Sequence, residues 1–226
     1  MRGEVDECRF HFLKLRLHTE VRLRPGETGI RIQDRIENLS ASPAEAQLLY
    51  HVNFGLPLLD AGSRLVVPAK TVVPRNARAA QGIAAWDSYQ GEQAGFEEQV
   101  YFLELFGDQQ NRTRVLLKNA HSTAAVGLEF RLDQLPCFTI WKNTTAAADG
   151  YVTGLEPGTN YPNPRSFEGK QGRLAKLTPR GSAQFELAIH YYGDPSSVEE
   201  AERSVRVLQA SPAQVFPNPI PDKCAP

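Results

Sequence analysis

The sequence predicts an all-β protein that folds as one large antiparallel β-sandwich. Three observations predict this: apolar and polar residues alternate along much of the chain, 17 glycines and 16 prolines are spread as in chains with many turns, and only one segment has a helical period. At 226 residues the chain is short for two domains. We expect a single sandwich domain at 1–210 and a proline-rich tail at 211–226, extended or disordered.

The alternation begins with a long hairpin. Apolar side chains occupy most second positions from Leu13 to Leu23, with basic residues between them. The turn-forming sequence Arg24-Pro25-Gly26-Glu27 follows, and isoleucines then alternate with polar residues from Ile30 to Ile36. A period of two on both sides of a turn predicts two antiparallel strands.

Further strands are predicted along most of the remaining chain. Two segments repeat the clear alternation, 124–132 and 185–191. Four shorter segments are apolar runs: 47–52, 100–105, 114–117 and 138–141. The helical exception lies near the C-terminus. There Ser197 and Glu200 have the spacing of a capping box, and apolar residues recur three or four positions apart. We therefore predict one helix at 197–209.

Composition argues against two classes of partner. Lysine and arginine number 25 against 26 aspartates and glutamates, which leaves no basic surplus to neutralise nucleic-acid phosphates. The mean hydropathy is −0.38, and no apolar run approaches the roughly 18 residues of a membrane span. Neither nucleic acid nor a membrane is an expected partner, and the sequence does not indicate an oligomeric state.

The cysteines and the N-terminus indicate a compartment. Cys8, Cys137 and Cys224 are an odd, scattered set without a CxxC pair, so neither a disulfide framework nor a zinc site is predicted. The first residues lack the apolar core of a signal peptide. We expect a reducing, cytoplasmic location.

Two segments contain candidate functional residues. The first, 48–60, embeds His51 and Asn53 in an apolar run, and the second, 151–160, places Glu156 at the end of an apolar strand. A core histidine and a surface glutamate at a turn are the structural alternatives. If both side chains are desolvated, burial raises the pKa of the glutamate and lowers that of the histidine, which suits general acid–base catalysis.

Other chemistries have less support in the sequence. It contains no G-x-S-x-G, Walker, GxGxxG or H-E-x-x-H motif, and no histidine that would activate a cysteine is evident. The remaining histidines are dispersed and are expected to be structural or exposed. Neither a cofactor nor a metal ion is predicted.

At these two segments the sequence resembles the aldose 1-epimerase, or galactose mutarotase-like, superfamily. It is most similar to an uncharacterised bacterial branch of unknown function, whose members carry strings similar to LLYHxNFGxPLLD and TxWKN…YVxGLEPxTN. In this sequence the first string occupies residues 48–60, and the two halves of the second occupy 139–143 and 151–160. The resemblance also takes in 5–17, 32–34, 37–38, Trp86 and 98–101, so it spans the chain to about Tyr192.

The resemblance implies a β-sandwich whose concave face binds a sugar. A histidine protonates the ring oxygen, a glutamate takes the proton of the anomeric hydroxyl, and the opened ring recloses as the other anomer. His51 stands at the position of the acid and Glu156 at that of the base. The sugar would also contact four further residues: Asn53, Trp141, Lys142 and Asn160. Asp87 is the candidate for the family's sugar-binding aspartate.

The resemblance also leaves alternatives open. Superfamily members usually carry further strands, and a substrate-holding histidine loop, before the point where this sequence starts, so the chain resembles an N-terminally shortened member. A non-catalytic carbohydrate-binding or regulatory module of the same fold is the main alternative to an anomer-interconverting enzyme. An unrelated β-sandwich interaction protein, in which both segments serve packing, is a third. Which sugar would bind is not indicated.

Overall fold

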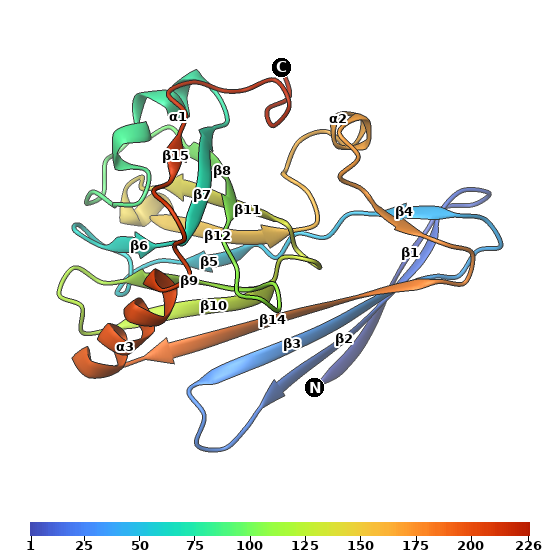
Figure 1. Cartoon of the computed structure of the whole chain (residues 1–226), viewed down its shortest axis with the longest axis horizontal. Helices are drawn as coiled ribbons and strands as arrows, with labels where there is room; N and C mark the ends of the chain where they lie inside the picture. The colour runs from blue at the N-terminus through green and yellow to red at the C-terminus, as the bar shows by residue number, and fades with distance from the viewer.

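The computed structural model describes residues 1–226, and two β-sheets packed face to face form its body (Figure 1). One sheet has seven strands, in the order β1 (Arg2–Cys8), β2 (Lys14–Leu23), β3 (Gly29–Asn38), β14 (Ser182–Tyr192), β10 (Ala125–Arg131), β9 (Arg112–Lys118) and β6 (Arg64–Val66). The other has six, in the order β15 (Gln214–Val215), β7 (Ala69–Pro74), β8 (Gln99–Leu105), β11 (Cys137–Asn143), β12 (Val152–Gly158) and β5 (Val52–Phe54). The predicted all-β sandwich is confirmed.

Alternation along the strands places the main core between the sheets. Leu128 and Leu187 on the seven-stranded sheet, and Phe138, Ile140 and Leu155 on the six-stranded sheet, belong to one buried apolar cluster. Because successive side chains of a strand point to opposite faces, the residues between them on β11 and β12 point away from this core. The outer face of the six-stranded sheet thus receives Thr139, Trp141 and Glu156.

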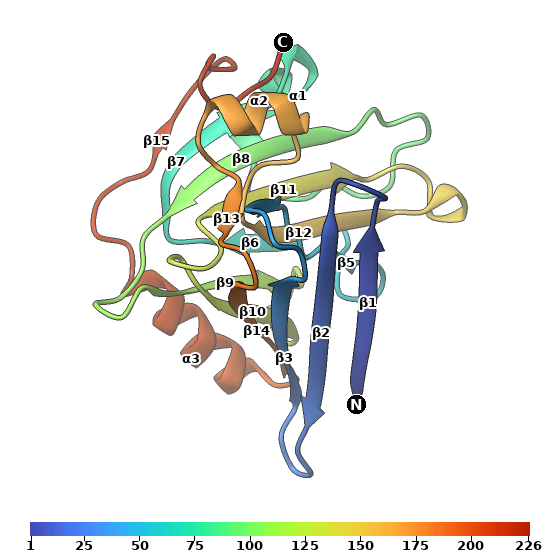
Figure 2. The same ribbon diagram turned by 90° about the vertical axis from the view of Figure 1, so that its right-hand side faces the viewer.

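The predicted hairpin is present as β2 and β3, but the strand before it was not predicted. β1 pairs antiparallel with β2 and forms the edge of the seven-stranded sheet (Figure 2). All seven of its residues are exposed. A strand that buries neither face needs no apolar alternation, so its sequence carries no such signal. A two-stranded sheet of β4 (Ala44–Ala46) and β13 (Ala175–Leu177) completes the β-structure.

The predicted helix is present as α3 (Pro195–Arg206), but it begins earlier than the capping-box pattern indicates. Its N-cap is Asp194, whose side chain accepts from the backbone N–H groups of Ser196 and Ser197, and Pro195 fits the first turn. Its apolar face packs on the sheet beside Leu116 and Ala125. The two other α-helices are short, α1 (Ala77–Gln81) and α2 (Arg165–Lys170). None of the helices is long and apolar enough to cross a membrane.

The C-terminal segment 211–226, expected to be extended or disordered, packs against the six-stranded sheet. β15 pairs in parallel with β7, and the segment runs along the outside of the six-stranded sheet (Figure 1). Phe216, Ile220 and Cys224 join an apolar cluster with Phe102 and Tyr161. Apolar residues spaced between the prolines therefore anchor the segment, although it has almost no regular structure of its own.

Candidate active site

Two adjacent elements of the six-stranded sheet bring His51 and Glu156 together. His51 immediately precedes β5, which pairs antiparallel with β12, and Glu156 lies on β12. Leu155 faces the core, so Glu156 faces outward. His51 Nε2 lies 3.1 Å from Glu156 Oε1. The long-range convergence expected from the two segments is therefore present, on one face of one sheet.

Glu156 is a buried carboxyl group. Only 3% of its side chain is exposed, and Oε1 accepts no well-aligned hydrogen bond despite its contact with His51. Burial raises the pKa of Glu156 to about 7, the negative charge of Glu98 adds to this rise, and His51 opposes it. A carboxyl group that gains and loses its proton near neutral pH is suited to general acid–base catalysis.

His51 is held from its other side by Asn53. The imidazole Nδ1 lies 2.8 Å from Asn53 Oδ1. An amide oxygen only accepts hydrogen bonds, so this contact places a proton on Nδ1 and directs Nε2 at Glu156. The His51 side chain is 45% exposed, whereas Glu156 is covered. The imidazole is therefore the solvent-accessible member of the pair.

Gly154 leaves the space in which these side chains meet. On β12 it pairs with Trp141 on one side and with Asn53 on the other. A Cβ atom at this position would lie 2.5 Å from Glu156 Oε1 and 3.1 Å from His51 Cε1. The glycine is therefore required by the close approach of the pair.

We expect Gly154→Ala to lower the free energy of unfolding by about 1–3 kcal/mol, because the added methyl group displaces a buried carboxylate. Gly3→Ala is a matched control, since its Cβ would meet only Thr19 Cγ2, at an ordinary 3.5 Å. Urea denaturation of both variants measures the difference. Equal stability of the two variants would show that the pair does not need this space.

Trp141 forms the neighbouring wall. The centroid of its ring lies 5.4 Å from that of the His51 ring, and the two ring planes meet edge to face at 65°. Its indole Nε1 donates to Glu98 Oε2 at 2.7 Å. An aromatic face beside a polar pair is the usual platform for the apolar side of a sugar ring.

Three other predicted site residues lie elsewhere. Lys142 faces the core side of β11, where Nζ donates to the carbonyl oxygens of Ala85 and Ser88, and burial lowers its pKa to about 8. The Asn160 amide accepts from Thr159 Oγ1 and donates to the Tyr161 carbonyl, so neighbouring groups occupy both of its ends. Asp87 lies 3.9 Å from Arg64 and makes no contact with the pair.

The structure adds residues that sequence reasoning missed. Thr139 is paired with Glu156 across β11 and β12, and its buried Oγ1 has no hydrogen-bond partner. Gly154 and Glu98 also contribute, as described above. The period of two could have predicted that Trp141 and Lys142 do not share a site, because adjacent residues of a strand face opposite sides of the sheet. No comparable sequence signal identifies Gly154.

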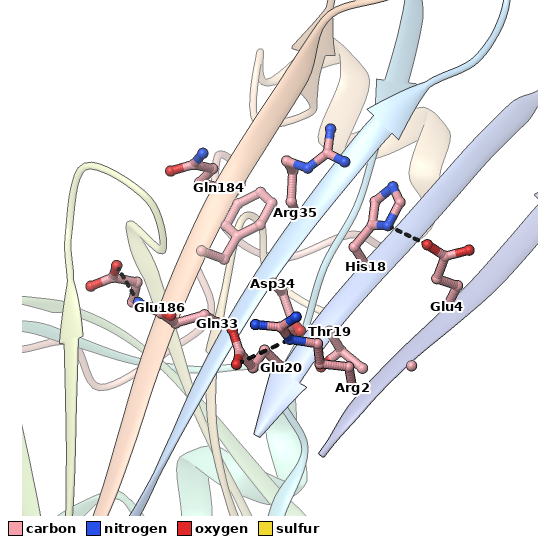
Figure 3. A pocket seen from close by; sticks show the side chains of 12 residues that line it. Arg2, Glu4, His18, Thr19, Glu20, Gln33, Asp34, Arg35, Gln184 and Glu186 are labelled. Atoms are coloured by element: carbon pink, nitrogen blue, oxygen red, sulfur yellow. Dashed lines mark hydrogen bonds and ion pairs between the residues drawn. The ribbon is translucent and has the colours of Figure 1, made fainter. Parts of the chain in front are cut away.

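A hollow of about 440 Å³ lies in the other sheet, over β1, β2, β3 and β14 (Figure 3). Long polar side chains line it, and several of them are paired, as in the 3.2 Å contact of Arg2 with Glu20 and the 2.9 Å contact of His18 with Glu4. Neither His51 nor Glu156 lines this hollow. The candidate site is therefore a separate feature.

Comparison with solved structures shows that the chain has a galactose mutarotase-like fold. A candidate aldose 1-epimerase from Klebsiella pneumoniae superposes with a TM-score of 0.94 at 34% identity, over 97% of this chain and 57% of that one. A galactose mutarotase-like protein from Clostridium acetobutylicum shares the fold, with a TM-score of 0.58 at 16% identity, over 84% of this chain and 61% of that one. A galactose 1-epimerase from Lactobacillus acidophilus gives a TM-score of 0.55 at 13% identity, over 85% of this chain and 67% of that one.

The chain belongs to the DUF4432 family, described as a domain of unknown function, whose model matches residues 1–191. No protein with a curated description matches it. The chain spans a little over half the length of the Klebsiella protein.

Proposed function

We propose that this protein binds a sugar on the outer face of the six-stranded sheet and interconverts its anomers by general acid–base catalysis. The observation that carries the proposal is the buried Glu156, whose pKa is raised to about 7 and whose unbonded Oε1 lies 3.1 Å from His51 Nε2. The similarity to a candidate aldose 1-epimerase supports the substrate class.

In the proposed reaction the two residues exchange one proton each with the sugar. Glu156, as the carboxylate, takes the proton of the anomeric hydroxyl while His51, as the imidazolium with a proton on each ring nitrogen, gives its Nε2 proton to the ring oxygen, and the bond between C1 and the ring oxygen breaks. After rotation about the C1–C2 bond the ring closes on the other face of C1. His51 then takes back the proton and Glu156 returns its own, so the pair ends as it began.

The direct contact between the two side chains must open when the sugar binds. Glu156 is fixed by burial, whereas His51 is 45% exposed, so His51 is the side chain that would turn, and its contact with Asn53 would have to adjust with it. The anomeric hydroxyl and the ring oxygen are both bonded to C1, so a modest separation admits them. Trp141 would then contact the apolar face of the sugar.

Exchange NMR of anomeric protons tests this proposal. We expect the folded protein to accelerate exchange above the rate in buffer for at least one member of a panel of neutral, amino and acidic aldoses. A folded preparation that accelerates none of them would overturn the enzymatic proposal.

A non-catalytic sugar-binding module is the second candidate, and one observation favours it. In the structure His51 and Glu156 already contact each other, so no sugar atom lies between them without a movement. Calorimetric binding of a sugar without faster anomer exchange would support this candidate in place of the enzyme.

A further inference from the structure

Glu98 is a charged residue beside the site to which the proposed reaction gives no role. It directly precedes β8 and opens the segment 98–101, one of those that carry the family resemblance. The next residue, Gln99, faces the core side, where its side chain donates to the Arg78 carbonyl and accepts from the Tyr101 hydroxyl. Glu98 therefore faces the outer side of the sheet, together with the candidate site.

The carboxylate of Glu98 holds the indole that stands beside His51. Trp141 Nε1 donates to Glu98 Oε2 at 2.7 Å, and the Trp141 ring lies 5.4 Å from that of His51. An indole has a single hydrogen-bond donor, so this bond fixes the direction of the ring. The other oxygen of Glu98 lies 3.9 Å from the guanidinium of Arg75.

The charged groups around Glu156 are few. His51 faces it from the segment before β5, and Glu98 acts on it from the start of β8. On β11 its neighbours Thr139 and Trp141 carry no charge. Arg75, which follows β7, contacts Glu98 instead. The negative charge of Glu98 therefore acts together with burial in raising the pKa of Glu156, against the opposing effect of His51.

We propose that Glu98 is a positioning residue of this site: it holds the Trp141 indole beside His51 and supplies a fixed negative charge next to the acid–base pair. As a statement about catalysis, this rests on the proposed function. Through Trp141 it sets the wall against which a sugar would lie, and through its charge it favours the protonated form of Glu156.

Three variants separate the two roles. Glu98→Gln removes the charge but keeps an oxygen that accepts from Trp141 Nε1, whereas Glu98→Ala removes both. Glu97→Gln is the matched control. Glu97 is adjacent in sequence and 81% exposed, and it lies 3.6 Å from Arg78 rather than at the site.

Carboxyl carbon NMR tests the charge in the absence of any sugar, with the Glu156 signal assigned by its loss in Glu156→Gln. We expect the titration midpoint of Glu156 to fall in Glu98→Gln and Glu98→Ala, because both variants remove a negative charge that favours the protonated carboxyl group. It should stay unchanged in Glu97→Gln. Coincident titration curves for the parent protein and Glu98→Gln would overturn this part of the proposal.

Tryptophan fluorescence tests the positioning role. The chain has two tryptophans, so a Trp86→Phe background isolates Trp141. We expect Glu98→Gln to preserve the Trp141 emission, and Glu98→Ala to shift it to longer wavelength and lower its anisotropy. An unchanged spectrum and anisotropy in Glu98→Ala would overturn the role. Neither readout needs a sugar, so both can succeed or fail independently of the anomer-exchange test.

Discussion

Glu156→Gln is expected to slow anomer exchange by about 10²–10⁴-fold, the usual contribution of a general base. Glutamine keeps the size and shape of the side chain but cannot accept the proton of the anomeric hydroxyl. The loss should appear in kcat, since the walls of the site are unchanged. Exchange NMR on the sugar that shows the highest rate measures the effect.

The control for this experiment is Glu97→Gln, which removes an exposed carboxylate from the segment just before β8. We expect it to keep the parent rate. A Glu156→Gln protein with the parent rate would show that Glu156 is not the base. A slow Glu156→Gln protein whose melting temperature is no lower than that of the parent would separate loss of chemistry from loss of fold.

Glu156 is also expected to make stability fall as the pH rises. Its pKa is about 7 in the folded protein against 4.5 for an ordinary glutamate, so the folded state holds this proton more tightly than the unfolded state does. The contribution of Glu156 to the free energy of unfolding therefore decreases as the pH rises from about 4.5 to about 7. Above that range the accumulated loss is about 3 kcal/mol.

The glutamine variant should remove this pH dependence. We expect Glu156→Gln and the parent protein to be about equally stable at pH 4, where both side chains are neutral. At pH 8 the variant should be more stable by up to about 3 kcal/mol, because it has no buried charge. Urea denaturation at both pH values measures the difference. A variant that is less stable than the parent at pH 8 would contradict a desolvated carboxylate.

The sequence predicted those parts of the fold whose strands bury at least one face. The hairpin of β2 and β3 and the strand around Leu187 follow the period of two, and the strand around Phe138 was predicted from its apolar run. β1 was not predicted because it is exposed on both faces. The C-terminal segment 211–226 was expected to be extended or disordered, and its anchoring to the sheet was not predicted because its apolar residues are scattered among prolines.

The sequence predicted the proximity of His51 and Glu156, but it predicted the residues around them only in part. His51 and Glu156 were identified from family resemblance, and sheet pairing brings them together. Lys142 was grouped with Trp141 because the two are adjacent in sequence, yet neighbours on a strand face opposite sides. Glu98 and Gly154 were missed because their roles arise from pairing between β8, β11 and β12, which no local pattern records.

A double-mutant cycle of His51→Gln and Glu156→Gln, read by exchange of anomeric protons, tests most directly whether the two residues act as one acid–base pair. The protons that they exchange with the sugar must balance, so removal of either group should stop the same reaction. We expect each single variant and the double variant to be slowed by similar factors. Losses that multiply in the double variant, or a single variant that keeps the parent rate, would contradict this expectation.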